Sequence, residues 1–394
     1  MTAHGTTDPG FGERQARPDG PPTVLQVLPA LETGGVERGT VDVAEGLAAA
    51  GWRALVASAG GRMERELVRA GAEHIRLPLA TKNPLAIRRN AGRLARLIRE
   101  RGVSLVHARS RAPAWSALWA AQATGVPFVT TFHGTYTLGS FEWKRRYNRV
   151  MTEGARVIAI SRFISEHMQA LYDTPAERIR VIPRGVDLSR FSPEAVSEPR
   201  LARLATRWRL PDDAPVVLMP GRLTQWKGQT LMIEAMARLN RPGVRCLIVG
   251  SDQGRTAYRE SLEELVARRG LGGQVHILDH CDDMPAAYRL ASVVVSASLE
   301  PEAFGRVPAE AQALGRVVLA PRHGGAVEIV EDGVSGWLFE PGDPDSLARH
   351  LAMALDLDEA GRDAMAFRGM MQTRRVFSKE AMVLDTLAVY GELI

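Results

Sequence analysis

Residues 293–320 read VVVSASLEPEAFGRVPAEAQALGRVVLA, and this stretch decides the fold. Its valine runs, Val293–Ser296 and Val317–Ala320, predict short buried strands, because β-branched residues are typical of strands covered on both faces. Between them Pro308–Leu314 predicts a helix that begins near Gly305, since a proline is tolerated only in the first helical turn. Strand, helix and strand in this order form a βαβ unit, which predicts a parallel sheet.

The same alternation extends along most of the chain in two series. The first series predicts strands at Thr23–Leu28, Arg53–Ser58, His74–Leu79, Leu105–Ala108, Phe128–Phe132, Val157–Ile160 and Ile179–Ile182, with helices at Val36–Ala50, Pro84–Arg101 and Arg162–Leu171. The second adds strands at Val216–Met219, Arg245–Val249, Val275–Leu278 and Gly336–Phe339, with helices at Gln229–Leu239, Arg259–Arg269, Ala286–Leu290 and Asp345–Leu355. The fold class is therefore α/β, with two doubly wound domains.

The length of 394 residues also suits two domains better than one core. The proline-rich segment Pro183–Pro199 breaks the alternation and indicates an interdomain linker, placed at 184–200. The domains then cover 23–183 and 201–375. The start, 1–22, is polar and rich in glycine and proline; it lacks the apolar core of a signal peptide, and we expect a disordered tail.

Composition excludes several classes of protein. An apolar fraction of 45% and a charged fraction of 24% are those of a soluble globular protein. Cys246 and Cys281 lack metal-ligand spacing, which excludes a zinc site and favours a reducing compartment. Arginines crowd 88–101, and basic residues crowd 144–149; each cluster is either a solvated face or a surface for anionic lipid or an acidic acceptor. Nucleic acid is disfavoured, because no aromatic-basic platform accompanies the charge.

Motifs of other doubly wound enzymes are missing. The first strand is followed by Thr33-Gly34-Gly35, without the G-x-G-x-x-G fingerprint of dinucleotide-binding proteins. No G-x-x-x-x-G-K-[ST] loop occurs either. The sequence therefore lacks the main motifs that would indicate a dehydrogenase or a P-loop enzyme.

Two glutamates flank the predicted helix start. Glu302 and Glu310 are eight residues apart, roughly 12 Å at helical rise. Paired glycosidase carboxylates need about 5 to 10 Å, so we do not expect them to act on one bond. The free N–H groups near Gly305 favour a phosphate. An extended ligand with central phosphates, such as a nucleotide sugar, fits this spacing; as isolated residues the glutamates would be a helix-start acid and a surface acid.

Two cations follow an earlier strand of the same domain. Gly221-Arg222 and Lys227-Gly228 come directly after Val216–Met219, ahead of the next helix. Alone, such residues are usually solvated. Together with the glutamate segment they predict a clamp that neutralises a departing diphosphate.

With these motifs the chain resembles the retaining GT-B glycosyltransferases of glycosyltransferase family four, also called group 1. The resemblance covers nearly the whole chain and rests on motifs in the expected order. They are Thr33-Gly34-Gly35, Phe132-His133-Gly134, Ala159-Ile160-Ser161, Pro183-Arg184-Gly185-Val186-Asp187, Gly221-Arg222, Lys227-Gly228, Glu302 with Glu310, and Gly324-Gly325. It implies two Rossmann-like domains facing across a cleft: an acceptor-side domain over 23–183, a donor-binding domain over 201–375, and a helix over 376–394 that returns to the first.

The resemblance also implies residue roles. Arg222 and Lys227 would bind the donor diphosphate beside Gly221. Glu310 would accept hydrogen bonds from the ribose, and Glu302 would contact the transferred sugar. His133 would lie beside the reacting centre. The backbone would approach the donor at Gly34, Gly35, Phe304, Gly305 and Arg306. Many family members have Asn where this chain has Arg184, so the resemblance assigns no role to this residue.

The implied chemistry uses no protein nucleophile, cofactor or metal; the nucleotide sugar is a co-substrate and the departing phosphate accepts the proton. Asp343-Pro344-Asp345 resembles the Asp-x-Asp metal motif of another glycosyltransferase class, but it precedes a predicted helix, where an aspartate cap explains it. We therefore predict helix capping there and no metal.

Several alternatives stay open. The base of the donor is uridine or guanosine. We expect a saccharide or lipid-linked acceptor, as in lipopolysaccharide synthesis, met in the cytoplasm or at the inner face of the cytoplasmic membrane. A non-hydrolysing nucleotide-sugar epimerase would share the fold without the Gly-Arg…Lys-Gly and two-glutamate set. A catalytically idle nucleotide-sugar-binding protein would keep binding without turnover.

Overall fold

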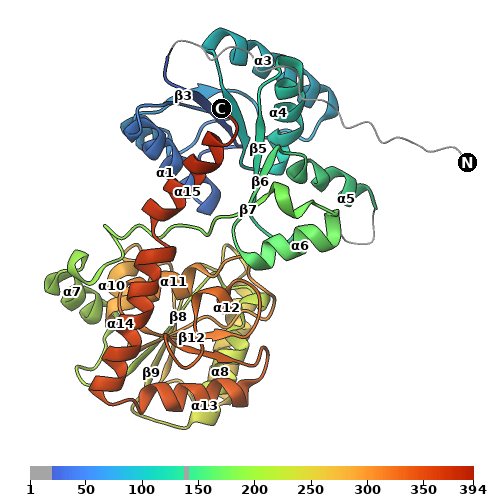
Figure 1. Cartoon of the computed structure of the whole chain (residues 1–394). Helices are drawn as coiled ribbons and strands as arrows, with labels where there is room; N and C mark the ends of the chain where they lie inside the picture. Colours follow the sequence, from blue (N-terminus) through green and yellow to red (C-terminus); the bar gives the residue numbers. More distant parts are fainter. Residues whose placement is uncertain (1–19, 137–141) are drawn as a thin grey trace, which may run out of the picture. The chain divides into compact units, whose positions relative to one another are not determined.

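The computed structural model describes residues 20–136 and 142–394, and the chain forms two compact units (Figure 1). The first unit comprises residues up to Ala159, Ser165–Ile182 and Val383–Ile394. The second comprises Ile160–Ile164 and Pro183–Met382. Most of the predicted tail, residues 1–19, lies outside the described residues. The predicted linker, 184–200, falls within the second unit.

The first unit is built on a parallel sheet. In the described part of the chain it has seven strands in the order β3-β2-β1-β4-β5-β6-β7. The strands are β1 (Thr23–Val27), β2 (Arg53–Ser58), β3 (Glu73–Arg76), β4 (Leu105–Ala108), β5 (Phe128–Phe132), β6 (Arg156–Ala159) and β7 (Ile179–Val181). The helices are α1 (Gly35–Ala49), α2 (Glu64–Arg69), α3 (Pro84–Arg101), α4 (Arg111–Thr124), α5 (Glu142–Asn148) and α6 (Arg162–Tyr172), with short 3₁₀ turns at Arg149–Thr152 and Ala176–Arg178. Every residue of β1 is buried, as expected for a strand covered on both faces.

The second unit repeats this plan. Its described residues form a parallel sheet of six strands in the order β10-β9-β8-β11-β12-β13. The strands are β8 (Val216–Pro220), β9 (Arg245–Val249), β10 (Val275–Leu278), β11 (Val293–Val295), β12 (Val317–Pro321) and β13 (Trp337–Phe339). The helices are α7 (Glu198–Trp208), α8 (Gln229–Leu239), α9 (Thr256–Arg268), α10 (Met284–Leu290), α11 (Arg306–Ala313), α12 (Ala326–Ile329), α13 (Pro344–Leu355) and α14 (Glu359–Val376), with 3₁₀ turns at Pro193–Ala195 and Gln225–Lys227. The prediction of two doubly wound Rossmann-like domains, the GT-B plan, is confirmed.

Local sequence explains why several predicted elements match the structure closely. The side chain of Asn83 accepts from the backbone N–H groups of Leu85 and Ala86, and Pro84 occupies the first position of α3. The helix ends where Gly102 adopts φ +60°, a left-handed conformation that glycine adopts without strain. Start and stop signals of this kind made α3 predictable to the residue.

The strand order places a topological switch point in each sheet. In the first sheet, β2 lies on one side of β1 and β4 pairs with β1 on its opposite side. In the second sheet, β9 and β11 flank β8 in the same way. In open parallel sheets, ligands bind beyond the carboxyl ends of the strands at such a point. The loops after β8 and β11, which carry Arg222, Lys227 and Glu302, lie at the switch point of the second unit.

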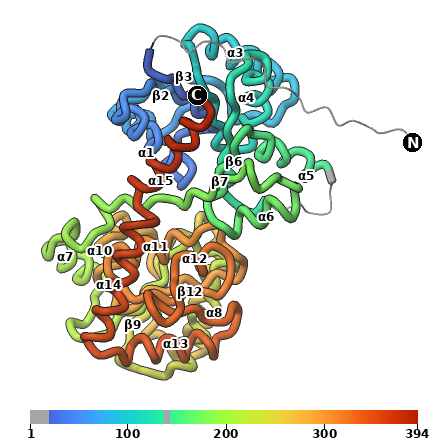
Figure 2. Tube along the Cα trace, viewed as in Figure 1, coloured from blue at the N-terminus to red at the C-terminus, as the bar shows by residue number. Residues whose placement is uncertain are grey.

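The carboxyl-terminal segment contributes to both units. Helix α14 packs against α11 in the second unit, and α15 (Lys379–Gly391) begins in that unit and ends in the first. Figure 2 shows the red end of the tube beside α1 in the first unit, where a Cβ built on Gly46 would lie 2.1 Å from the Val383 side chain. Among residues 20–136 and 142–394, no helix combines the length and apolarity needed to cross a membrane.

Candidate functional site: the switch point of the second unit

Two loops of the second unit pack closely at their backbones. The loop after β8 runs from Gly221, with φ +157°, to Gly228, with φ +79°. A Cβ on Gly228 would lie 1.9 Å from the carbonyl oxygen of Ala297, in the loop after β11. A Cβ on Gly250 would lie equally close, 1.9 Å, to the carbonyl oxygen of Gly221. These glycines are required for close approach, and this approach holds the predicted cations beside the predicted glutamate segment.

Lys227 and Glu302 form an ion pair across these loops. Lys227 Nζ donates to Glu302 Oε1 at 2.8 Å, and the two side chains are only 15% and 20% exposed. The Ser298 hydroxyl donates to the same oxygen, and Ser298 is buried. Lys227 Nζ also lies 4.3 Å from the ring centroid of Trp226. Both hydrogen bonds end on Oε1, and neither of these two donors bonds to the Oε2 atom of Glu302.

Glu310 has a different set of partners. The Tyr288 hydroxyl donates to its Oε2 at 3.0 Å, and Arg306 Nη2 donates to its Oε1 at 2.7 Å. Glu310 is 9% exposed, and Tyr288 is buried. Burial, followed by the charge of Glu310, holds the pKa of the Tyr288 phenol well above its usual range. The phenol therefore stays protonated and available as a donor to the carboxylate.

The start of α11 lies between the two glutamates in sequence. Gly305 is its N-cap with φ +109° and makes no side-chain cap hydrogen bond, and the N-terminus of a helix is an environment that favours an anion. Helix α11 begins at Arg306, so Glu302 lies before it. Our estimate of the glutamate separation from helical rise was therefore wrong for residues 302–305, which are not helical. The separate sets of partners still assign the two carboxylates to different sites.

The Gly324-Gly325 pair supports the glutamate loop from behind. The backbone N–H of Gly325 donates to the carbonyl of Glu302 at 2.7 Å. A Cβ on Gly324 would lie 2.6 Å from the carbonyl oxygen of Glu302, and one on Gly325 would lie 2.3 Å from that of Phe304. Side chains at either position would displace the loop that carries Glu302.

Arg222 lies in the loop after β8 and is exposed. Its backbone carbonyl accepts from Gln229 Nε2 at 2.9 Å, and the Tyr258 hydroxyl donates to Gln229 Oε1 at 3.1 Å. The backbone of Arg222 is thus fixed while its guanidinium remains accessible to a ligand.

The remaining predicted residues belong to the first unit. Gly34 and Gly35 follow β1, with Gly34 as the N-cap and Gly35 as the first residue of α1. A Cβ on Gly34 would lie 2.4 Å from Glu37 Oε2. His133 directly follows β5 and is half-buried. These residues lie at the carboxyl ends of two strands, the edge at which ligands bind in this class of sheet.

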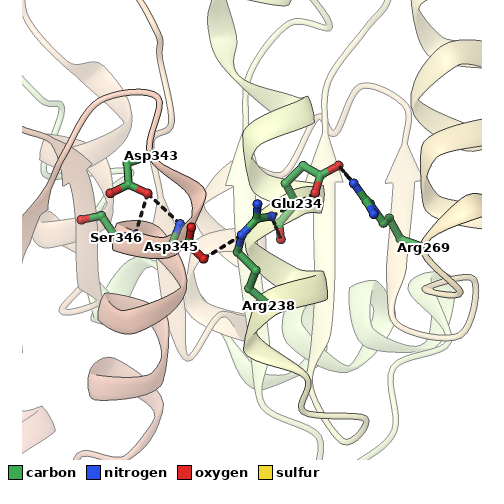
Figure 3. A network of polar contacts seen from close by, with 6 residues as sticks. All are labelled: Glu234, Arg238, Arg269, Asp343, Asp345 and Ser346. Carbon is green, nitrogen blue, oxygen red and sulfur yellow. Dashed lines mark hydrogen bonds and ion pairs between the residues drawn. The ribbon is translucent and has the colours of Figure 1, made fainter.

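The Asp-x-Asp sequence caps a helix. Asp343 Oδ1 accepts from the backbone N–H groups of Asp345 and Ser346 at 2.9 and 3.1 Å (Figure 3). Asp345 pairs with Arg238 at 2.8 Å, and Glu234 joins Arg238 to Arg269 in the same surface network. The prediction of capping at Asp343 is confirmed.

Sequence reasoning missed Ser298 and Tyr288. Tyr288 lies on a helix that was predicted, and Ser298 lies in the loop after β11, but nothing in the sequence indicates that their hydroxyls face carboxylates. A small polar residue shortly after a buried strand, four positions before Glu302, was the only available signal for Ser298. Tyr288 offered none, because a tyrosine on a short helix is usually part of the core.

Comparisons with known proteins agree with this architecture. The model of Glycosyltransferase Family 4 matches residues 33–190, and that of Glycosyl transferases group 1 matches residues 203–367. A D-inositol 3-phosphate glycosyltransferase of Salinispora tropica is 36% identical over 256 residues, which are 62% of this chain and 52% of that protein. The match thus spans about half the length of that relative.

Solved structures extend the likeness to nearly the whole chain. The crystal structure of a glycosyltransferase from Rickettsia africae is 34% identical, has a TM-score of 0.88 and is matched over 95% of this chain and 98% of its own. Anabaena Alr3699/HepE in complex with UDP is 25% identical, with a TM-score of 0.81, over 94% and 100% of the two chains. The fold and the site define the GT-B class of two-domain α/β proteins. Within that class the chain belongs to glycosyltransferase family four, as predicted from its motifs.

Proposed function

We propose that the chain is a retaining glycosyltransferase that transfers a sugar from a nucleotide-sugar donor. The observation that carries the proposal is the switch point of the second unit, where Lys227, Glu302 and the start of α11, whose N-cap Gly305 makes no side-chain cap hydrogen bond, share two closely packed loops. The likeness to a protein solved with UDP supports a UDP-sugar as the first donor to test, with a GDP-sugar as the alternative.

In this proposal the donor diphosphate lies at the start of α11. Arg222 and Lys227 neutralise the charge that develops on the departing phosphate, and the N–H groups beyond Gly305 add hydrogen bonds. Gly221, Phe304 and Arg306 contribute backbone that approaches the donor, together with Gly34 and Gly35 of the first unit. Lys227 already has Glu302 as a partner, so the ammonium group is held in place before the donor arrives.

The two glutamates hold the donor in place. Glu310, fixed by Tyr288 and Arg306, accepts hydrogen bonds from the ribose. Glu302 offers Oε2 to a hydroxyl of the transferred sugar, because Lys227 and Ser298 both bind Oε1. His133 lies beside the sugar at the reacting centre. Catalysis then rests on positioning and on stabilising the leaving group; the departing phosphate takes the acceptor proton and the sugar keeps its anomeric configuration, without a metal or cofactor.

The proposed acceptor is a saccharide or a lipid-linked saccharide of a cell-surface glycan, lipopolysaccharide among them. The exposed arginines of α3, Arg88, Arg89 and Arg96, support a peripheral contact with an anionic membrane at its cytoplasmic face. Flotation with phosphatidylcholine liposomes, with and without an anionic phospholipid, tests this part; equal failure to bind both kinds would refute it.

The experiment that tests the activity is a thermal-shift screen against UDP- and GDP-sugars, followed by analysis of the products. We expect one nucleotide sugar to raise the melting temperature and to release its nucleoside diphosphate when an acceptor is present. Formation of an epimeric nucleotide sugar instead would identify an epimerase. Binding without any transfer or donor hydrolysis would identify an idle binding protein.

A further inference from the structure

A basic hollow lies in the first unit, apart from the residues assigned above. It has a volume of about 760 Å³ and lies along α5, the following 3₁₀ turn and the end of α6. Its lining residues are Trp143, Arg145, Arg146, Arg149, Tyr172 and Asp173. We call it the arginine pocket.

The charge of this pocket is only partly neutralised. Three arginines face one aspartate, and Asp173 lies 3.4 Å from Arg145 with its side chain 87% exposed. Arg149 Nε lies 3.0 Å from Glu153, and Arg146 is exposed. Arg145 near the end of α5 and Arg149 at the start of the following 3₁₀ turn line the same pocket with like charges, which repel one another. An anion bound between these guanidinium groups would relieve that repulsion.

The wall of the pocket is fixed by buried contacts. Asn148 is buried, and its Nδ2 donates to the Tyr172 hydroxyl at 3.3 Å while its Oδ1 accepts from Arg111 at 3.0 Å. These bonds join α5 to the ends of α6 and α4. The ring of Tyr172 lies 5.6 Å from that of Phe132, the last residue of β5. The pocket is therefore preformed, and it is one aromatic ring away from the strand that His133 follows.

We propose that the arginine pocket binds a phosphate or carboxylate group of a saccharide acceptor. The inference rests on the proposed function and names the class of its acceptor. Guanidinium groups bind both anions in the bidentate manner, and the 63% exposed Trp143 supplies a flat aromatic face for a sugar ring. A concave site suits a discrete group better than a membrane surface. The exposed arginines Arg88, Arg89 and Arg96 of α3 are better placed for a membrane.

The test compares two double variants that remove the same charge from the same unit. R146A/R149A empties the pocket of two arginines, whereas R89A/R96A removes two exposed arginines of α3 as a control. Calorimetric titration of the full chain with glucose 6-phosphate, glucuronate, glucose and inorganic phosphate measures binding. We expect a charged sugar to bind at least tenfold more tightly than glucose or inorganic phosphate. R146A/R149A should lose about tenfold or more of that affinity, and the control should change less than twofold.

Three outcomes would overturn the proposal. The first is equal binding of charged and neutral sugars by the unmodified chain. The second is unchanged affinity of R146A/R149A for the charged sugar. The third is that R146A/R149A loses binding to anionic phospholipid vesicles but keeps its affinity for charged sugars. The last would make the pocket a membrane contact. Nucleotide-sugar binding is measured on the same samples. If donors bind and turn over but the pocket variant behaves as the control does, the pocket inference fails alone; if no donor binds, the proposed function fails.

Discussion

Replacing Ser298 by alanine removes a single hydroxyl, and this small substitution should have a clear effect on sugar transfer. Its buried hydroxyl donates to Glu302 Oε1 beside Lys227. A hydrogen bond to a charged group contributes about 1.5–3 kcal/mol, so Ser298→Ala should lower turnover by about tenfold or more. Binding of UDP itself should change less than twofold, because Glu302 is proposed to contact the sugar. Steady-state kinetics and UDP titration separate the two effects.

Ser296→Ala is the matched control, since Ser296 is a buried serine two residues earlier in the same segment. Its activity should equal that of the unmodified chain. If Ser298→Ala instead weakened UDP and UDP-sugar equally, Ser298 would support the loop in general and would not position Glu302.

Glu310 and Lys227 should affect different kinetic constants. Glu310→Gln keeps a group that can accept from Tyr288 but loses the charge offered to the ribose, so donor affinity should fall about tenfold with turnover little changed.

Lys227→Ala should mainly reduce kcat, by about 100- to 1,000-fold, because the lysine is proposed to stabilise charge that develops in the transition state. Glu300→Gln, at an exposed acid of the same loop, is the control. Full activity in both site variants would refute the assignment.

At the scale of residues, the sequence could propose which side chains form the candidate site but not which contacts they make. Arg222, Lys227, Glu302 and Glu310 could be proposed because their spacing after two strands limits where they can lie. Ser298 and Tyr288 could not, because the partner of a hydroxyl depends on the path of the loop after β11 for Ser298 and on the packing of two helices for Tyr288. Tyr288 and Glu310 lie 22 residues apart, on different helices.

Among the elements, α15 depends on one carboxylate close to its end. Glu392 accepts from Arg156 Nε at 2.6 Å and from Arg180 Nη2 at 2.7 Å. These bonds, with that from Arg180 the strongest cause, lower the pKa of Glu392 to about 2. Because the pKa is lowered in the folded state, the stabilisation is present at neutral pH and is lost as the pH falls from about 4.5 toward 2.

Glu392→Gln should therefore destabilise the first unit near pH 7 but not near pH 2. The side chain is 32% exposed, so solvent screening limits the expected loss to about 1–2 kcal/mol. Hydrogen exchange of the α15 backbone at several pH values measures it. Glu380→Gln, at an exposed position of the same helix, should show no difference at any pH. A Glu392→Gln deficit that stayed constant down to pH 2 would contradict the ionic origin.

Elements with clear local signals were predicted closely, and those without were missed. Helix α3 matches its predicted range because its Asn83 cap, Pro84 and apolar periodicity agree, and α8 matches through its apolar periodicity between Gly228 and Asn240. Helix α14 was not predicted, because its buried positions are Met365, Gly369 and Thr373, of which only one is a large apolar residue. Such a helix lacks the apolar stripe by which sequence analysis recognises helices.

At the scale of the whole molecule, the last residues of the chain should stabilise the first unit. Tyr390 is fully buried, and its hydroxyl lies 2.6 Å from His107 Nδ1, a contact across 283 residues; His107 Nε2 lies 2.7 Å from the Thr131 hydroxyl. Burial, followed by the charge of Arg109, holds the pKa of His107 well below its usual value, so the imidazole is neutral. A neutral imidazole has one donor and one acceptor nitrogen, so it donates to one hydroxyl and accepts from the other. No local pattern could have predicted this pair.

Tyr390→Ala should cost about 3–5 kcal/mol through the cavity and the unsatisfied imidazole, and Tyr390→Phe about 1–3 kcal/mol through the hydrogen bond alone. The loss should appear as faster hydrogen exchange in β4 and β5, while β8 and β11 of the second unit stay protected, because Val383–Ile394 belong to the first unit. Leu384→Ala, at a side chain 67% exposed on the same helix, should leave both sheets unchanged. Equal deprotection of both sheets by Tyr390→Phe would show that the two units unfold together, and the contact would then stabilise the chain as one cooperative body.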